Sequence, residues 1–345
     1  MAKVSLAVKY RPKKFEDVSG QSSTKTILEQ MLSSDDVAHA LLFVGSAGTG
    51  KTTCARIFAD RINDGLGQPI ELDAASNSGV DDVRDIIYQS RLKSLDSEYK
   101  VFIIDECHSL SNTAWQAFLK LLEEPPEKSI FIFCTTNPEK IPRTILSRVQ
   151  RFDFQRISQS DIITRLRHIC DCELQKEDDL VRLEALEYIA KIADGGMRTA
   201  ITYLDKVISY SREVTLSNVL STLGVADYSV MLELTKHIYN GEERGIVETI
   251  EKLYASGIDL TRFIRQYINF VLDVKKVNIT GTFEYTQLPE TDELKEYLTS
   301  YNGSSVFKEA LDHLLVTLVN LNNTIKYDSS PKSMVEIYLL REVWE

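Results

Sequence analysis

The sequence predicts a doubly wound α/β domain with a parallel sheet, followed by regions that are entirely α-helical. Between residues 38 and 155, short and mostly continuous apolar runs recur, as is typical of parallel strands covered on both faces. Amphipathic helical segments separate these runs, and this alternation indicates a doubly wound sheet. After about residue 156 the strand signals stop and only helical patterns follow. The predicted fold class is therefore α/β plus all-α.

The expected strands lie in the first half of the chain, at Ala40–Gly45, Ile70–Asp73, Val101–Glu106, Ile130–Thr136 and Val149–Phe154. Between them, segments such as Ala55–Ile62 and Trp115–Leu122 repeat apolar residues at helical spacing. Later helical patterns cover Asp161–Cys172, Leu183–Asp194, Met197–Tyr210, Met231–Ile238, Leu260–Val271, Leu311–Ile325 and Met334–Trp344. Asn278–Thr291 is predicted to be a long loop. We expect three domains, at residues 1–155, 156–222 and 223–345.

Composition and charge limit the class of protein. The chain has 345 residues, 43% of them hydrophobic, which is enough for two or three packed domains. No apolar run approaches the roughly 20 residues that cross a bilayer, and no apolar segment of the secretory type follows Met1–Val4. We therefore expect a cytoplasmic protein with no membrane partner. Because the net charge is −11, any contact with nucleic acid has to be local.

The five cysteines form no recognisable disulfide framework or metal site. They are Cys54, Cys107, Cys134, Cys170 and Cys172, and no two are spaced as Cys-x-x-Cys. We interpret the close pair Cys170 and Cys172 as ordinary helix surface or core. The sequence therefore predicts no bound zinc.

A glycine-rich segment follows the first expected strand and opens a helix. Residues 45–52 fit the pattern G-x-x-x-x-G-K-[ST] in the strand–loop–helix context that binds nucleotide phosphates. Its glycines allow backbone N–H groups to converge on phosphate oxygens at a helix N-terminus. Lys51 would reach the β- and γ-phosphates of ATP, and the Thr52 hydroxyl would ligate Mg²⁺. The expected nucleotide-binding residues of this loop are Gly45, Ser46, Ala47, Gly48, Thr49, Gly50, Lys51, Thr52 and Thr53.

Two carboxylates end the third expected strand, at the sheet edge where ligands bind in such folds. Asp105 would hold Mg²⁺, directly or through water, and Glu106 would polarise the attacking water as a general base. Acidic residues end many strands without a function, but beside a phosphate-binding loop they indicate ATP hydrolysis. His108 is close in sequence, fits no metal motif and is interpreted as structural.

Together these motifs resemble the AAA+ clamp-loader ATPases, most closely the bacterial DNA polymerase III gamma/tau family, over roughly the first 210 residues. The similar segments are Val8–Pro12 with Phe15–Gln21, Leu72–Asp81, and Asp105–Ser111 with Leu121–Pro126. The resemblance implies an AAA+ parallel-sheet domain, a helical lid at 156–222 and a helical collar that joins subunits at 223–345. The first segment is similar to the family's adenine-side opening, which implies nucleotide contacts for Tyr10, Arg11 and Val18.

Three further positions carry over from the family. Thr136 matches sensor 1, which hydrogen-bonds the γ-phosphate or the water. Arg148 matches an arginine that reaches the ATP of a neighbouring subunit, although Val149 stands where the family has Cys. Arg198 matches sensor 2, and a bound phosphate would offset the cost of a cation in the first turn of a helix. The simpler alternatives are that Thr136 is only a polar residue at a strand end and that Arg148 and Arg198 are only surface residues.

Two features depart from the family. Only Ile62–Pro69 separate Arg61 from the second expected strand, and none of them is Cys, so the family's four-cysteine zinc module is absent. The chain also ends soon after the third expected domain, without a long tau-type tail. A compact, phage-encoded form, acting in a bacterial host's cytoplasm, would fit both absences.

The resemblance implies a Mg²⁺-dependent ATPase that loads a sliding clamp onto primed DNA for processive replication. Its implied partners are the clamp, other loader subunits in a pentameric ring, primed DNA through phosphate contacts, and the replicative polymerase. Helix starts near Ser78–Gly79 and Asn112–Thr113 are candidates for those contacts. The alternatives are a helicase loader or Holliday-junction motor, against which Asp73–Asp81 and Ser147-Arg148 argue, and a non-hydrolysing loader subunit. Against the latter stand Lys51, Thr52, Asp105 and Glu106.

Overall fold

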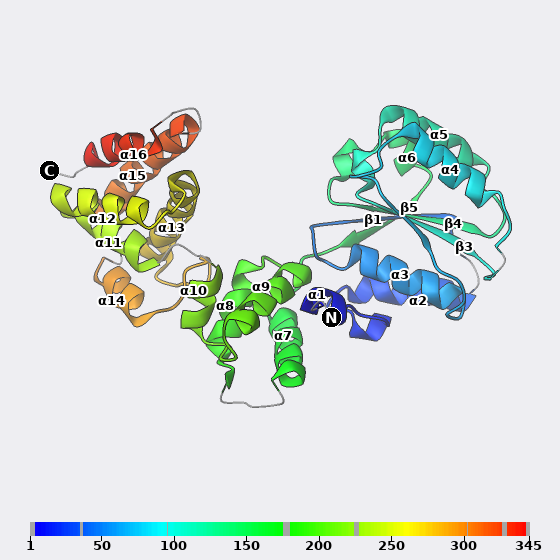
Figure 1. Cartoon of the computed structure of the whole chain (residues 1–345), viewed down its shortest axis with the longest axis horizontal. Helices are drawn as coiled ribbons and strands as arrows, with labels where there is room; N and C mark the ends of the chain where they lie inside the picture. The colour runs from blue at the N-terminus through cyan, green and yellow to red at the C-terminus, as the bar shows by residue number, and fades with distance from the viewer. Residues whose placement is uncertain are drawn as a thin grey trace. The chain divides into compact units, whose positions relative to one another are not determined.

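The computed structural model describes residues 4–34, 37–94, 96–174, 180–223, 228–301, 303–325 and 330–342. The chain divides into two compact units, Met1–Thr215 and Leu216–Glu345. The first unit contains a sheet with helices on both faces and a further group of helices, and the second unit contains helices (Figure 1). Among the described helices, none is both long and apolar enough to cross a membrane.

Five parallel strands form the sheet of the first unit, in the order β2-β3-β4-β1-β5. The strands are β1 Ala40–Gly45, β2 Ile70–Asp73, β3 Lys100–Asp105, β4 Ser129–Thr135 and β5 Gln150–Phe154. Because they run parallel, their carboxyl ends meet at one edge, where Asp73 is the register partner of Asp105. The predicted parallel sheet is confirmed. The sequence predicts Glu106, Thr136 and Val149 inside strands, whereas each lies one residue outside a strand.

Helices α2 and α3 cover one face of the sheet, and α4, α5 and α6 cover the other (Figure 1). Alternate strand residues point to opposite faces, so Ile103 packs in the cluster of Phe58, and Phe133 packs in that of Phe118. The rings of Phe118 and Phe133 meet edge-on, 5.2 Å apart. Truncating a buried phenylalanine typically costs about 3–5 kcal/mol. The helices are α2 Ser22–Ser34, α3 Lys51–Ile62, α4 Val80–Ser90, α5 Asn112–Glu123 and α6 Arg143–Leu146, with single 3-10 turns η1 Phe15–Asp17, η2 Cys107–Ser109 and η3 Pro138–Lys140.

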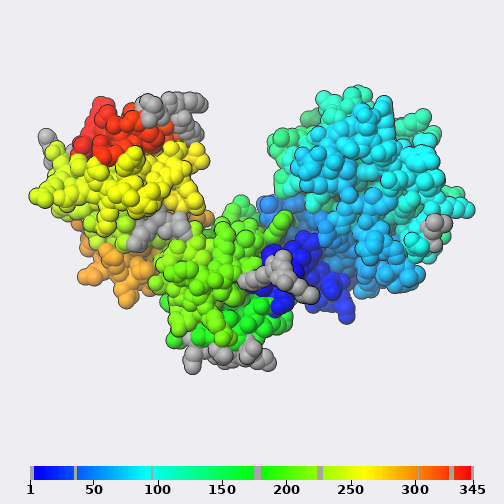
Figure 2. Space-filling view, in the orientation of Figure 1, coloured from blue at the N-terminus to red at the C-terminus, as the bar shows by residue number. Residues whose placement is uncertain are grey.

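Three lid helices follow β5 within the first unit: α7 Gln159–Glu173, α8 Leu183–Ile192 and α9 Met197–Tyr210. Helix α7 begins after Ser158, whose hydroxyl accepts the N–H of Asp161. The short helix α1, Leu6–Lys9, packs against α9, where the N–H of Leu6 donates to the carboxylate of Asp205 at 3.0 Å. Figure 2 shows this dark blue N-terminal segment against the green lid helices. The lid therefore holds a segment from the start of the chain.

The second unit is a helical domain with its own apolar core. Its helices are α10 Leu216–Leu223, α11 Tyr228–Tyr239, α12 Glu243–Ala255, α13 Leu260–Thr280, α14 Asp292–Ser300, α15 Ser305–Thr324 and α16 Pro331–Leu340. The stripes predicted within Met231–Ile238 and Leu260–Val271 face that core. Asp259 caps α13 by accepting the N–H groups of Thr261 and Arg262. The domain boundaries expected at 155/156 and 222/223 stay predictions.

Two predicted element bounds in this unit are wrong. The sequence predicts a loop over Asn278–Thr291, but α13 continues to Thr280 and ends at Gly281, whose φ of 70° suits a left-handed helix end. Asn278 is buried and donates to the carbonyl of Tyr301, so tertiary contacts retain this last turn. The helix predicted at Met334–Trp344 ends at Leu340. Trp344 lies outside the described residues.

Candidate active site

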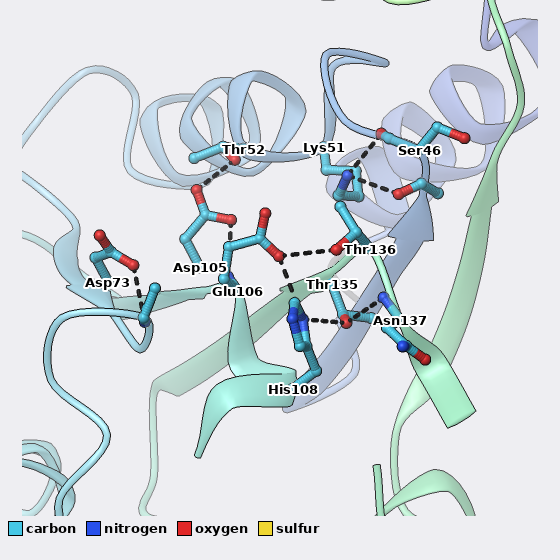
Figure 3. Close-up of polar contacts among 12 residues, drawn as sticks. Ser46, Lys51, Thr52, Asp73, Asp105, Glu106, His108, Thr135, Thr136 and Asn137 are labelled. Carbon is cyan, nitrogen blue, oxygen red and sulfur yellow. Dashed lines mark hydrogen bonds and ion pairs between the residues drawn. The ribbon is translucent and has the colours of Figure 1, made fainter. Parts of the chain in front are cut away.

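The glycine-rich loop turns from β1 into α3 at the carboxyl edge of the sheet. Gly50 precedes the helix with a φ of 103°, a left-handed value that residues with a Cβ rarely adopt. Lys51 begins the helix, and its ammonium donates to the carbonyl oxygens of Gly45 and Ser46, each at 2.8 Å (Figure 3). Lys51 is only 6% exposed, and this burial lowers the pKa of its ammonium. A buried cation whose hydrogen bonds go to neutral carbonyl groups is suited to receive an anion.

Thr52 and Asp105 meet beside this loop. Thr52 Oγ1 donates to Asp105 Oδ2 at 2.7 Å, and Asp105 Oδ1 accepts the N–H of Glu106 at 3.0 Å (Figure 3). Hydroxyl and carboxylate oxygens are the ligands that Mg²⁺ prefers, and Mg²⁺ commonly adds phosphate oxygens and water to one or two protein ligands. Within the described residues there is no group of three or more His, Cys, Asp or Glu that could hold a metal. The donor set therefore fits a magnesium ion shared with phosphate.

Glu106 follows β3 in an uncommon backbone conformation. Its φ of 46° and ψ of 41° are left-handed, which costs energy in a residue with a side chain and recurs at functional positions. Oε2 of Glu106 accepts from Thr136 Oγ1 at 3.2 Å and lies 3.3 Å from His108 Nδ1 (Figure 3). His108 Nδ1 also lies 3.1 Å from Thr135 Oγ1. The end of β4 and the turn after β3 thus orient this carboxylate together.

A cavity of about 220 Å³ lies between the glycine-rich loop and the start of α9. The two elements approach closely, because a Cβ on Gly48 would lie 3.3 Å from Cα of Gly196. The predicted site residues that line the cavity are Tyr10, Arg11, Val18, Ala47, Gly48, Thr49, Gly50, Lys51, Thr52, Thr53, Asp105, Glu106 and Arg198. The other predicted site residues, Gly45, Ser46, Thr136 and Arg148, are not among the described residues that line it. Thr136 reaches the site through Glu106.

Tyr10 and Arg11 enter the cavity from the N-terminal segment. The Tyr10 hydroxyl donates to Glu173 of α7 at 2.5 Å, and burial together with this carboxylate raises the pKa of Tyr10. The pKa of the Arg11 guanidinium is lowered, first by burial and then by the positive charges of Arg56 and Arg198. Arg11 and Arg198 both line the cavity, and their positive charge favours an anionic ligand.

Arg148 lies between α6 and β5, an edge strand of the sheet. Its Nη2 donates to Glu123 Oε1 at 2.8 Å, and its Nη1 donates to the carbonyl of Thr144 at 2.9 Å. The Arg148 side chain is 36% exposed. It is an accessible cation that pairs within its own chain.

The two helix starts predicted to contact phosphates lie next to each other. The N–H of Ser111 donates to the carbonyl of Ser78 at 3.4 Å, which joins the start of α5 to that of α4. The Ser111 hydroxyl caps α5 by accepting the N–H of Ala114. The first helical N–H groups of both helices therefore lie in one region of the first unit.

His108 is a residue of this site that the sequence does not reveal as part of it, and the same holds for Arg165 and Thr199, which line the cavity. The spacing of His108 matches no metal motif, so the pattern alone favours a structural histidine. The 3-10 turn Cys107–Ser109 brings the imidazole back toward Glu106, two positions earlier. A polar ring two residues after a strand-ending carboxylate is the only sequence signal for this contact, and it depends on a turn that the sequence leaves open.

Family models match two parts of the chain. Residues 70–158 match the model described as DNA polymerase III, delta subunit. Residues 214–344 match the model described as DNA polymerase III subunits gamma and tau domain III. The second match covers most of the helical unit, where the sequence motifs are weakest.

Curated relatives match most of the chain. It is 35% identical to DNA polymerase III subunit tau of Bacillus subtilis, over 96% of this chain and 62% of that protein. It is 31% identical to protein STICHEL of Arabidopsis thaliana, over 98% and 29%. It is 32% identical to DNA polymerase III subunit tau of Escherichia coli, over 80% and 46%. The chain thus spans less than two thirds of the length of these relatives.

Among solved structures, the chain is similar to the Holliday junction branch migration motor RuvB of Thermotoga maritima. The TM-score is 0.51 at 21% sequence identity, and the match covers 66% of this chain and 79% of that one. At this identity the similarity concerns the fold alone. It supports the predicted AAA+ arrangement of a parallel sheet and helices.

Proposed function

Because this chain belongs to the DNA polymerase III gamma/tau family, we propose that it is an ATPase subunit of a DNA sliding-clamp loader. In this proposal, ATP binding and hydrolysis drive loading of the clamp onto primed DNA for processive replication. The observation that carries it is the meeting of Lys51, Thr52, Asp105 and Glu106 at one edge of the sheet, beside a cavity that Arg198 also lines.

The proposed ATP site uses backbone and side chains together. N–H groups of residues 45–53 surround the phosphates, and the Lys51 ammonium exchanges its two carbonyl partners for β- and γ-phosphate oxygens. Thr52 and Asp105 would hold Mg²⁺, which when bound would supply positive charge that stabilises the phosphoryl oxygens. Arg198 contacts the γ-phosphate from the lid, and its place in the lining of the same cavity as Lys51 supports this role.

Tyr10, Arg11 and Val18 contribute to the same cavity from the N-terminal segment. We propose that Tyr10 and Val18 contact the nucleotide on the adenine side. Arg11 lines the cavity together with Arg198 and Asp105, and we propose that it also contacts the nucleotide.

Hydrolysis requires a base and an aligned water. Glu106 takes a proton from the water as its oxygen attacks the γ-phosphorus, and the bond to the β–γ bridging oxygen breaks to give ADP. Thr136 hydrogen-bonds the γ-phosphate or the water. Its present contact with Glu106 supports a position within reach of both.

Arg148 acts in trans in this proposal. Its exposure, and its absence from the described lining of the cavity, support contact with ATP in a neighbouring subunit. Such an arginine finger stabilises the charge of the transferring phosphoryl group.

The proposed assembly is a pentameric ring held together by a collar, residues 223–345, with the sliding clamp and other loader subunits as partners. The neighbouring helix starts at Ser78–Gly79 and Asn112–Thr113 would contact phosphates of primed DNA. The replicative polymerase is a further proposed partner. We place this assembly in the cytoplasm of a bacterium, or of a bacterial host if the chain is phage-encoded.

We also propose that the chain binds no zinc, because Ile62–Pro69 offer no cysteine ligand. Elemental analysis of the purified protein checks this. Near-stoichiometric zinc that resists dialysis would contradict it.

Clamp-dependent DNA synthesis on a primed circular template tests the main proposal. With the clamp, polymerase and other loader subunits of the source organism, this chain should stimulate synthesis when ATP is present. Glu106→Gln should still bind ATP but lose about 10²–10⁴-fold in hydrolysis rate, and stimulation with it. A rate of ATP hydrolysis that does not change when clamp and primed DNA are added would favour another AAA+ DNA-processing motor. Clamp loading without hydrolysis by this chain would favour a structural subunit.

A further inference from the structure

A chain of polar contacts connects the carboxylate of Glu106 to the backbone beyond β4. Oε2 of Glu106 lies 3.3 Å from His108 Nδ1, which lies 3.1 Å from Thr135 Oγ1 (Figure 3). Thr135 is fully buried, and its Oγ1 accepts the N–H of Asn137 at 3.0 Å. Nδ1 of the imidazole therefore lies between the hydroxyl of Thr135 and the carboxylate of Glu106, and its single proton can be donated to one of these oxygens or shared between them.

Glu106 needs such support because little else restrains its side chain. The side chain is 36% exposed, and Glu106 itself has a left-handed backbone at the open end of the sheet. A glutamate side chain in that setting has several accessible rotamers, and only some aim its oxygens at an attacking water. Thr136 supplies one restraint, through its hydrogen bond to Oε2.

That restraint conflicts with the role proposed for Thr136. A hydroxyl carries a single proton, so Thr136 cannot donate to Glu106 and to a γ-phosphate oxygen at the same time. Once ATP engages Thr136, the remaining side-chain donor facing Oε2 among the described residues is His108. His108, like Thr136, is not one of the described residues lining the cavity, and its printed contacts are with Glu106 and Thr135.

We propose that His108 is a positioning residue for hydrolysis: Nδ1–H donates to Glu106 and keeps that carboxylate aimed at the attacking water while Thr136 engages the phosphate. This inference rests on the proposed ATPase function. His108 acts only through Glu106 and touches neither nucleotide nor water. A histidine with a purely structural role would need its ring volume and its Nδ1 contact with Thr135, but not the contact with Glu106.

Two amide substitutions separate these roles. In His108→Asn the side-chain amide nitrogen can occupy the place of Nδ1, whereas in His108→Gln it extends toward the place of Nε2. His108→Ala removes both the donor and the ring. Single-turnover hydrolysis of radiolabelled ATP by the assembled loader gives the rate of the chemical step, and a fluorescent ATP analogue gives the affinity. Thermal unfolding of each variant shows whether it folds.

We expect His108→Ala and His108→Gln to lower the hydrolysis rate on the order of 10- to 100-fold, with nucleotide affinity unchanged within about twofold. His108→Asn should recover most of the rate. In a Glu106→Gln background, His108→Ala should cause no further loss, because the group it positions is already gone. If His108→Ala does not fold, the difference in hydrolysis rate between the His108→Asn and His108→Gln variants tests the proposal.

Equal rates in the Asn and Gln variants would overturn the proposal, as would an undiminished rate in His108→Ala. A His108→Ala defect that multiplies that of Glu106→Gln would also overturn it. These outcomes leave the ATPase proposal standing when the unaltered loader hydrolyses ATP and Glu106→Gln does not. Absence of hydrolysis by the unaltered loader, or full activity in Glu106→Gln, would instead overturn the proposed function.

Discussion

The cavity edge of the sheet and the corner between α6 and β5 differ in how they hold their charged residues. At the cavity edge, Lys51 is 6% exposed and Thr52 already contacts Asp105. At the corner, Arg148 is 36% exposed and its partner Glu123 is 53% exposed. Folding alone thus arranges the groups proposed to bind the chain's own ATP. The group proposed to act on a neighbour's ATP stays at the surface, with a partner that it can exchange.

Lys51→Ala tests the cavity side of this comparison, and we expect the largest effect there. Tight ATP binding should disappear, because the variant loses the buried ammonium proposed to contact the phosphates. Among the described residues, Lys51 is the only cation that donates to the carbonyl groups of the glycine-rich loop. At an ATP concentration 100-fold above its dissociation constant, binding adds about 2.7 kcal/mol to the stability of a protein. The rise in melting temperature with ATP should therefore vanish in the variant.

The control is the melting temperature of the Lys51→Ala variant measured without nucleotide. Its melting temperature should stay close to that of the unaltered chain, because the ammonium makes no ion pair among the described residues and its burial is costly. Unimpaired stabilisation by ATP would show that the phosphates bind elsewhere.

Arg148→Ala tests the exposed side. ATP binding to the isolated chain should be nearly unchanged, because Arg148 does not line the cavity. Hydrolysis by the assembled loader should fall by about 10³-fold or more, as for other arginine fingers. Arg143→Ala is a matched control, since Arg143 is an exposed cation on α6 and should be neutral.

A mixing experiment distinguishes action in cis from action in trans. The Arg148→Ala chain has an intact glycine-rich loop, and the Lys51→Ala chain has an intact Arg148. Where the second presents its arginine to ATP bound by the first, hydrolysis should partly return. Mixed assemblies that form but never recover activity would make Arg148 a structural residue.

Features that are determined by neighbouring residues in the sequence could be predicted from it. The loop of Gly50, Lys51 and Thr52 builds its site largely from its own backbone, and Asp105 ends a strand whose apolar run is plain. The parallel sheet followed from the same alternation of apolar runs and helices. Each of these predictions depends on local pattern alone.

Features that depend on how a turn closes or on distant partners could not be predicted. The contact of His108 with Glu106 requires the 3-10 turn after β3. The pairing of Arg148 with Glu123 joins residues 25 positions apart. The extension of α13 to Thr280 is stabilised by Asn278, which finds its acceptor on Tyr301. No periodicity encodes these partners, because they arise when separate elements pack together.

Glu123→Gln tests whether the partner of Arg148 affects hydrolysis, and we expect the smallest effect there. The Arg148–Glu123 pair is exposed, so it is worth at most about 1 kcal/mol. Two contacts remain without it, because Nη1 also donates to the carbonyl of Thr144 and lies 3.2 Å from Ser147 Oγ. The guanidinium therefore keeps its direction and loses only a competing anion.

We expect hydrolysis by the assembled Glu123→Gln loader to stay level or rise, by no more than about fivefold, since about 1 kcal/mol corresponds to such a factor. Any rise should shrink at high salt, where the carboxylate of the unaltered chain is already screened. Glu124→Gln is the matched control, because Glu124 is exposed and its carboxylate makes no contact with Arg148 among the described residues. A tenfold fall in Glu123→Gln alone would mean that the carboxylate aims the arginine, and that the corner, like the cavity edge, is arranged by folding.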